Sequence, residues 1–298
     1  MPKPLIIGSR GSDLALWQAN YVQALLNQAN IASEIRIIQT KGDQIQHLSL
    51  DKLEGKGFFT KEIEDALLRK EIDIAVHSHK DLETTPPEGL IVAAVSERAD
   101  ARELLLIRPE CKDETQPMQL KKEAVVGTSS ARRKSQVLSH RSDVHLKDIR
   151  GNVPTRVQKL RDGQFDAILL AKAGVDRLNL SLDGLHVVVL DHQEFVPAPA
   201  QGALAIQCRE DDKDTLAMVR HLHHAETAAA IHIERTILNR MKGGCHLPLG
   251  VHAEAAAEGW KIEVAFAQSW DAPTRRWTER VSDADQAIED ILTQLMSA

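Results

Sequence analysis

Arg132 and Arg133 lie where the sequence predicts that a strand turns into a helix. The stretch VVGTSSARRKSQ reads as a short strand, a Gly-Thr-Ser-Ser turn and the first turn of a helix. The free N–H groups of a helix start favour anions, and a cation there is unfavourable unless an anion is close by. The pair therefore indicates an anion at this turn, although a capped surface helix with solvated arginines explains the motif alone equally well.

Further cations lie near other expected strand or helix boundaries, at Arg150, Arg156 and Arg177. Near the amino terminus, GSRGSD puts Arg10 and Ser12 at an equivalent strand-to-helix turn. In doubly wound sheets, the ligand crevice is lined by the strand and helix ends at one edge of the sheet. Because Arg binds carboxylates and phosphates through two N–H groups at once, we expect a ligand with several such groups. The sequence contains no Gly-x-Gly-x-x-Gly or Walker pattern, so a nucleotide is not the obvious anion.

The strand IDIAVHSHKD ends with a base and an acid, Lys80 and Asp81. We expect both residues at a sheet edge of the kind that lines a ligand crevice. Adjacent Lys and Asp residues commonly form a structural ion pair, and that explanation is one alternative. Alternatively, a carboxylate in a partly desolvated site stabilises positive charge that develops on a reacting group. Asp81 is then the residue that supports a cation formed on the ligand.

Cys245 lies between a glycine pair and a His-Leu-Pro-Leu-Gly run, and it could be a nucleophile, a metal ligand, an attachment point or a buried thiol. The three cysteines, which include Cys111 and Cys208, form no close pair, so we expect reduced thiols. Cys208 alternates with inward strand positions and is expected in the core. We predict no metal site, because the histidines considered lack a Cys or carboxylate at metal-ligand spacing. Those histidines are His77, His79, His221, His223, His224 and His246.

Length and charge limit the classes of protein. A chain of 298 residues predicts two or three domains. A net charge of -6 and an aromatic content of 3% argue against nucleic-acid binding. Residues 128–161 nevertheless hold nine Lys or Arg against two Asp, a local net charge of +7. No apolar run approaches the roughly 20 residues of a membrane helix and no signal segment is recognisable, so we expect a cytoplasmic protein without membrane contact.

Strand and helix patterns alternate in two blocks of similar rhythm. The first block has strands near 5–10, 33–40 and 72–78, helices over 12–29 and 58–70, and a long polar loop over 41–57. The second has strands near 123–130, 144–149, 165–171 and 186–190 and helices over 131–140 and 153–162. Mostly parallel sheets in two α/β domains are predicted, with a double hinge and a binding cleft between them. The last eighty or so residues predict a separate α+β domain, with helices over 226–241 and 283–298 around two antiparallel strands.

Taken together, these motifs resemble the porphobilinogen deaminase, or hydroxymethylbilane synthase, family. The resemblance covers almost the whole chain, through IIGSRGSDLALWQA, EGKGFFTKEIEDALL, IDIAVHSHKD, VVGTSSARRKSQ, IRGNVPTRVQKL, DAILLAKAGVDRL, PAPAQGALAIQCRED and RMKGGCHLPLG. It implies an α/β fold with two periplasmic-binding-protein-like domains joined by a double hinge, and a small C-terminal α+β domain. The implied boundaries are 1–98 with 197–215 for domain 1, 99–196 for domain 2, and 216–298 for the C-terminal domain.

The resemblance also implies a reaction and a cofactor. The family condenses four porphobilinogen molecules, with loss of ammonia, onto a covalent dipyrromethane, and then releases linear hydroxymethylbilane by hydrolysis. By position in the matching motifs, Cys245 holds the cofactor as a thioether and Asp81 is the catalytic carboxylate. The implied ligands of the carboxylate side chains are Arg10, Ser12, Lys80, Thr128, Ser130, Arg132, Arg133, Arg150, Arg156 and Arg177. The implied flap carries Lys56, Gly57 and Phe59, and the implied state is a monomer.

Four positions depart from the family pattern, at His79, Glu83, Ala131 and His246, as does the stretch ERADARE over 97–103, and none of these departures removes an implied chemical role. Two other functions compete with the deaminase. A non-catalytic, two-lobed anion-binding protein would account for the domains and the arginines, but it leaves Cys245 and Asp81 unexplained. A cysteine hydrolase would need a base for the thiol, and the sequence offers no convincing one.

Overall fold

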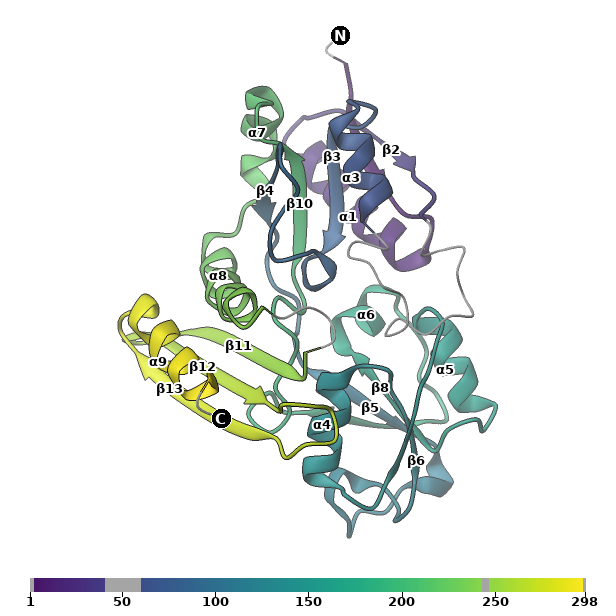
Figure 1. The fold of residues 1–298 in the computed structure, drawn as a ribbon. Helices are drawn as coiled ribbons and strands as arrows, with labels where there is room; N and C mark the ends of the chain where they lie inside the picture. Colours follow the sequence, from purple (N-terminus) through teal and green to yellow (C-terminus); the bar gives the residue numbers. More distant parts are fainter. Residues whose placement is uncertain (1–2, 41–59, 243–246, 297–298) are drawn as a thin grey trace. The chain divides into compact units, whose positions relative to one another are not determined.

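A computed structural model describes residues 3–40, 60–242 and 247–296 of the chain (Figure 1). The chain divides into two compact units, Met1–Ala99 with Gly202–Ala229 and Asp100–Gln201 with Ala230–Ala298. The chain crosses from one unit to the other at 99–100 and crosses back at 201–202. A double hinge requires two such crossings. The three-domain boundaries derived from the sequence stay a prediction.

The first unit contains a five-stranded sheet in the order β2-β1-β3-β10-β4. β1 runs parallel to β2 and β3, whereas β10 runs antiparallel to β3 and β4. The sheet is therefore mixed and not mostly parallel, because β10 arrives from the second unit and enters between β3 and β4 in the opposite sense. The strands are β1 (Leu5–Ser9), β2 (Ser33–Ile37), β3 (Ile74–Ser78), β4 (Leu90–Val95) and β10 (Leu204–Arg209).

Helices cover both faces of this sheet, since side chains alternate along each strand. On one face, Val22 and Leu26 of α1 (Asp13–Gln28) pack with Ile74 of β3. On the other face, α3 (Lys61–Leu68) packs against Ile6. The short helices α7 (Lys213–Val219) and η5 (Arg220–Leu222) join the first of these two clusters through Val219 and Leu222.

The second unit begins with a sheet in the order β7-β6-β8-β5-β9. β6 runs parallel to β7 and β8, and β5 runs antiparallel to β8 and β9. Order and direction therefore repeat those of the first sheet strand for strand. The elements are β5 (Glu103–Ile107), β6 (Val125–Gly127), α4 (Ala131–His140), β7 (His145–Lys147), α5 (Val153–Arg161), β8 (Ala167–Ala171), α6 (Lys172–Arg177) and β9 (His186–Leu190), with the short helices η3 (Pro109–Cys111) and η4 (Pro117–Gln119) after β5.

The C-terminal part of the second unit is an antiparallel sheet, β11-β12-β13, with two helices. Its elements are α8 (Ala225–Arg240), β11 (Leu249–Ala256), β12 (Gly259–Phe266), β13 (Arg275–Val281) and α9 (Ala284–Met296). Alternate residues of β11 and β12, including Val251, Ile262 and Val264, pack with α8 and α9 in one core. The opposite face of the same two strands carries His252, Glu254, Lys261 and Glu263. The α+β architecture expected here is confirmed, with β13 as an additional strand.

The two described cysteines are both buried. Cys208 lies in the core of the first unit, as predicted, and burial raises the pKa of its thiol to about 11. Cys111 is likewise a buried free thiol. Within the described part of the chain, none of the helices combines the length and the hydropathy needed to cross a bilayer.

Candidate active site

Arg10 and Ser12 follow the end of β1 and precede α1. Ser12 has extended backbone angles, and its side-chain oxygen accepts a hydrogen bond from the Ala15 N–H at 3.4 Å, so it caps the helix. Arg10, two residues earlier, is half-buried. The turn therefore holds a guanidinium beside the N-terminus of a sixteen-residue helix.

Lys80 and Asp81 lie in a short helical turn, η2 (His79–Asp81), directly after β3. The turn is fixed on one side by the His79 N–H, which donates to Ala203 O at 3.0 Å. Because β1 and β3 are parallel neighbours, both strands end at the same edge of the sheet. The structure thus places Arg10, Ser12, Lys80 and Asp81 at one edge of the first sheet, where Asp81 is exposed.

A second histidine, His77, lies within β3 and is buried. Burial lowers the pKa of this imidazole to about 4, with the Arg10 cation acting in the same direction. His77 is therefore neutral at physiological pH and contributes no positive charge beside the turn. Lys80 and Asp81 are the acid and the lysine of the turn that follows this strand.

Thr128 and Ser130 form the corresponding turn in the second unit, between β6 and α4. Ser130 caps α4 by accepting from the Arg133 N–H at 3.4 Å, and Thr128 is buried. Between them, Ser129 accepts from the Ile149 N–H at 3.0 Å and donates to Ile149 O at 2.9 Å. These bonds join the turn after β6 to the segment after β7, which runs parallel to β6.

The anion that the arginine pair requires is present in the protein itself, as Glu103 of β5. Glu103 is fully buried, and its Oε1 lies 2.5 Å from Arg132 Nη2. Arg133 donates to both oxygens of Glu103, through Nη2 at 2.8 Å and through Nε at 3.2 Å. Backbone carbonyls of Val196 and Leu169 accept the remaining described bonds, at 2.9 and 3.1 Å. Both arginines are buried, so the alternative of solvated arginines on a surface helix is wrong.

Burial and the Glu103 carboxylate act on the pKa of Arg132 in opposite directions, and the Arg133 cation acts in the same direction as burial. Burial lowers the pKa of its guanidinium, and Glu103 opposes that shift. Sequence reasoning missed Glu103, although an acid at the start of the apolar run ELLLI was a usable signal. A carboxylate in such a position is normally neutralised by a specific partner. The sequence does not indicate which cations supply that charge.

Arg150, Arg156 and Arg177 surround the same edge of the second sheet. Arg150 follows β7, Arg156 lies in the first half of α5, and Arg177 ends α6, which begins directly after β8. Arg156 Nε donates to Gly151 O at 2.8 Å. Nη2 of Arg150 is buried and has no hydrogen-bond partner among the described residues. Because buried polar groups are normally satisfied, this N–H is available to an oxygen of a ligand or of a water molecule.

Four predicted residues cannot be placed. Cys245 and the flap residues Lys56, Gly57 and Phe59 lie outside the described residues. The other predicted ligands form two groups, one at the edge of each sheet. The first group can supply a carboxylate and two cations, and the second supplies hydroxyls, backbone N–H groups and several guanidiniums. Each group, taken by itself, offers donors that suit carboxylate oxygens, such as those of dipyrromethane.

The family models and the curated relatives point to one family. A family model described as "Porphobilinogen deaminase, dipyromethane cofactor binding domain" matches residues 5–217, and one described as "Porphobilinogen deaminase, C-terminal domain" matches residues 228–270. A porphobilinogen deaminase of Sulfurimonas denitrificans is 45% identical over 86% of this chain and 81% of its own length. One from Chlorobium chlorochromatii is 44% identical over 92% of this chain and 86% of its own length.

Solved structures with a similar chain path include a periplasmic substrate-binding protein from Coxiella burnetii. It is 12% identical, with a TM-score of 0.44, over 78% of this chain and 96% of its own. A periplasmic domain of BvgS from Bordetella pertussis has the same TM-score at 13% identity, over 77% of this chain and 92% of its own. The family assignment does not depend on these two similarities.

Proposed function

The chain belongs to the porphobilinogen deaminase family, and from that premise we propose which of its residues carry the reaction. The enzyme is a transferase that joins four porphobilinogen molecules head to tail, with loss of ammonia, in porphyrin and haem biosynthesis. Its cofactor is dipyrromethane. The finished linear hydroxymethylbilane is released by hydrolysis. A non-catalytic anion-binding protein is not favoured.

Asp81 is proposed as the catalytic residue. When ammonia leaves porphobilinogen, the substrate becomes a methylene pyrroleninium cation, and a carboxylate at the reacting carbon lowers the energy of that charge. The position of Asp81 supports this assignment, because it lies in a short turn at the end of a buried strand, next to Lys80. Such a turn holds the carboxylate at a fixed place while leaving it accessible to substrate.

The cations at the two sheet edges are proposed to hold the acetate and propionate groups of the pyrroles. Bound dipyrromethane supplies the free α-carbon of its terminal ring, the atom that the first substrate carbon joins. The proposed ligands remain Arg10, Ser12, Lys80, Thr128, Ser130, Arg132, Arg133, Arg150, Arg156 and Arg177. The buried Nη2 of Arg150 is the observation that carries this proposal. A guanidinium has five N–H groups, so the internal bonds of Arg132 are compatible with a ligand carboxylate.

Cys245 is proposed as the attachment point, through a thioether that keeps the cofactor on the enzyme during turnover. Lys56, Gly57 and Phe59 are proposed as part of a flap over the bound pyrroles. We further propose that the protein acts as a cytoplasmic monomer, without nucleic acid or membrane. The two described cysteines support a reducing compartment, since both are free.

The activity itself is tested by incubating the purified protein with porphobilinogen. We expect one ammonia for each porphobilinogen consumed and a linear tetrapyrrole as the product, identified by its mass. Binding of porphobilinogen without release of ammonia would support the anion-binding alternative. That outcome would contradict the assignment of Asp81 as a catalytic group.

Replacing Arg150 with Gln is expected to lower kcat/KM for porphobilinogen by about 10- to 100-fold, which corresponds to the loss of one charge-assisted hydrogen bond. The matched control is Arg161→Gln, because Arg161 is exposed at the end of α5 and its described bonds go to backbone carbonyls of Ser181 and Asp183. Steady-state kinetics of both variants decide the matter. Equal effects of the two substitutions would remove Arg150 from the ligand set.

A further inference from the structure

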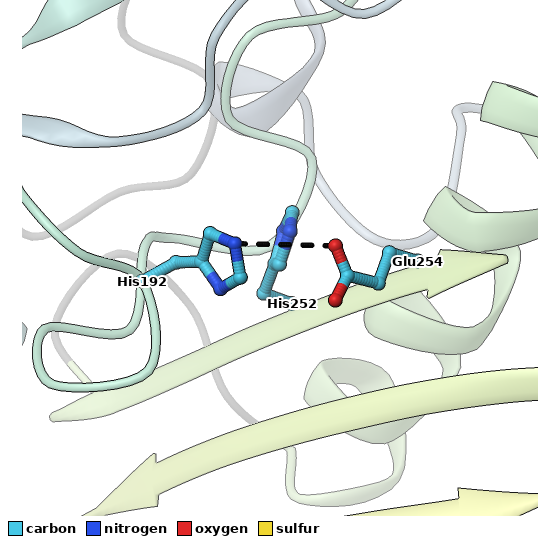
Figure 2. Close-up of side chains that lie close together, drawn as sticks. All are labelled: His192, His252 and Glu254. Carbon is cyan, nitrogen blue, oxygen red and sulfur yellow. Dashed lines mark ion pairs between the residues drawn. The ribbon is translucent and has the colours of Figure 1, made fainter. Parts of the chain in front are cut away.

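Three potential metal ligands from two separate segments lie together in the second unit. His192 follows β9, whereas His252 and Glu254 lie two residues apart on β11 and therefore on the same face of that strand. One ligand atom of each residue lies within 4.8 Å of the others. The centroids of the two imidazole rings are 4.6 Å apart (Figure 2). Figure 2 draws the three side chains, with a dashed line for the ion pair between His192 and Glu254. Sequence reasoning missed this group because the two histidines are sixty residues apart.

The neighbouring residues already orient the three side chains. Glu263 is 2% exposed, and its Oε2 lies 2.5 Å from His192 Nδ1. This bond places the proton on Nδ1 and leaves the lone pair of Nε2 directed toward Glu254, whose Oε2 lies 3.9 Å away. A carboxylate on the far nitrogen of an imidazole is the usual support for a metal-binding histidine. The Lys261 ammonium pairs with the other oxygen of each carboxylate. Its Nζ lies 2.8 Å from Glu263 Oε1 and 3.2 Å from Glu254 Oε1.

The charges of this cluster favour a divalent cation. Glu234 is fully buried, accepts backbone N–H groups of Ala200 at 2.6 Å and Ala253 at 2.8 Å, and lies 3.7 Å from His252 Nδ1. With neutral histidines, Glu234, Glu254 and Glu263 bring three negative charges against the single positive charge of Lys261. The two buried carboxylates, Glu234 and Glu263, require compensating charge. One divalent ion on two neutral imidazoles balances the remaining two charges.

We propose that His192, His252 and Glu254 bind one Zn²⁺, with water as the fourth ligand. Two imidazoles and a carboxylate suit zinc, whereas Ca²⁺ and Mg²⁺ prefer oxygen ligands only. Tetrahedral bonds of about 2.1 Å place ligand atoms about 3.4 Å apart. The side chains must therefore approach one another by about 1 Å when the ion binds, a movement set by this bond length. Glu254 and His192 allow it, because their side chains are 41% and 21% exposed.

The ion would join the segment after β9 to the C-terminal sheet within the second unit. It would contact none of the residues assigned to the reaction, so its role is structural. This inference is independent of the proposed catalytic residues. Its failure would leave the deaminase assignment unchanged.

The test uses the full-length protein with its cofactor attached, freed of metal by a chelator and titrated with Zn²⁺ alone in a calorimeter. One equivalent is expected to bind. His192→Gln and Glu254→Gln are each expected to weaken binding at least about 10-fold, as is Glu263→Gln, which removes the supporting carboxylate. The control is His232→Gln, since His232 is exposed on α8 and should leave binding unchanged.

Bound Co²⁺ provides a second measurement that does not depend on heats. Four-coordinate Co²⁺ on two imidazoles is expected to absorb visible light in the parent protein and in His232→Gln, and to lose that absorption in His192→Gln. The proposal is overturned if the parent protein binds no Zn²⁺. It is equally overturned if His192→Gln and Glu254→Gln bind Zn²⁺ as tightly as the parent.

Discussion

An Asp81→Asn variant is expected to fold like the parent protein and to lose nearly all turnover of porphobilinogen. The amide has the shape of the carboxylate but not its charge, so it cannot stabilise the cation that remains when ammonia leaves. Removing one such electrostatic group from an active site typically lowers kcat by about 10²- to 10³-fold. Asp81 is exposed in η2, so the substitution does not disturb the core.

Rates of ammonia release and thermal unfolding curves, measured on the same preparation, separate catalysis from folding. The control is Glu88→Gln, an exposed acid in the same unit whose charge has no proposed role. Both variants should unfold at the temperature of the parent, and only Asp81→Asn should lose activity. Near-normal turnover by Asp81→Asn would remove this carboxylate from the mechanism.

The largest effect on stability is expected from Glu103→Gln. This change leaves the guanidiniums of Arg132 and Arg133 in a buried site without the carboxylate that both contact. Breaking a buried ion pair by removing one partner costs about 3–5 kcal/mol, because the remaining charge stays desolvated. We therefore expect a much lower free energy of unfolding, measured from the midpoint of a urea titration.

A surface ion pair provides the matched comparison. Glu110 pairs with Arg108 at an exposed position, so Glu110→Gln should change the urea midpoint little. If Glu103→Gln were as stable as Glu110→Gln, the buried triad would not be the source of stability inferred for it. A loss of porphobilinogen turnover that exceeds the loss of folded protein would show that Glu103 also positions the two arginines for ligand binding.

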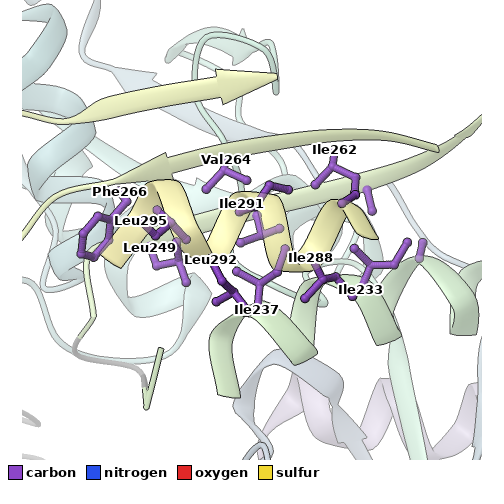
Figure 3. Packing of buried hydrophobic residues seen from close by; sticks show 14 residues of the cluster. Ile233, Ile237, Leu249, Ile262, Val264, Phe266, Ile288, Ile291, Leu292 and Leu295 are labelled. Atoms are coloured by element: carbon purple, nitrogen blue, oxygen red, sulfur yellow. The ribbon is translucent and has the colours of Figure 1, made fainter. Parts of the chain in front are cut away.

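Local patterns in the sequence predicted the elements that depend on local chemistry. The helix near the carboxyl terminus is an example, because Ile288, Ile291, Leu292 and Leu295 recur at helical spacing and lie in the core (Figure 3). Met296 belongs to the same pattern but is 65% exposed. The helix caps are equally local, since Ser12 and Ser130 each accept from an N–H three residues further along the chain. β5 and β13 were missed, because a strand is defined by partners that are distant in sequence.

The candidate site shows the same division. Turns after parallel strands are local features, so the sequence indicated that Arg10, Lys80 and Asp81 lie at strand ends. The partner of the arginine pair was not predictable, because Glu103 is brought to α4 by a strand that runs antiparallel to β8. The direction of β10 likewise depends on distant segments, because the chain comes back from the second unit before it pairs with β3 and β4. Pairing between distant segments is decided by the packed structure and not by periodicity.

The central claim is that this deaminase carries dipyrromethane covalently on Cys245, and the intact mass of the purified protein tests it most directly. Protein made in a haem-producing host should be heavier than its sequence by one dipyrromethane. Cys245→Ser made in the same host should have the mass of the bare chain. A parent protein with the bare mass, or a Cys245→Ser variant that retains the added mass, would contradict the claim.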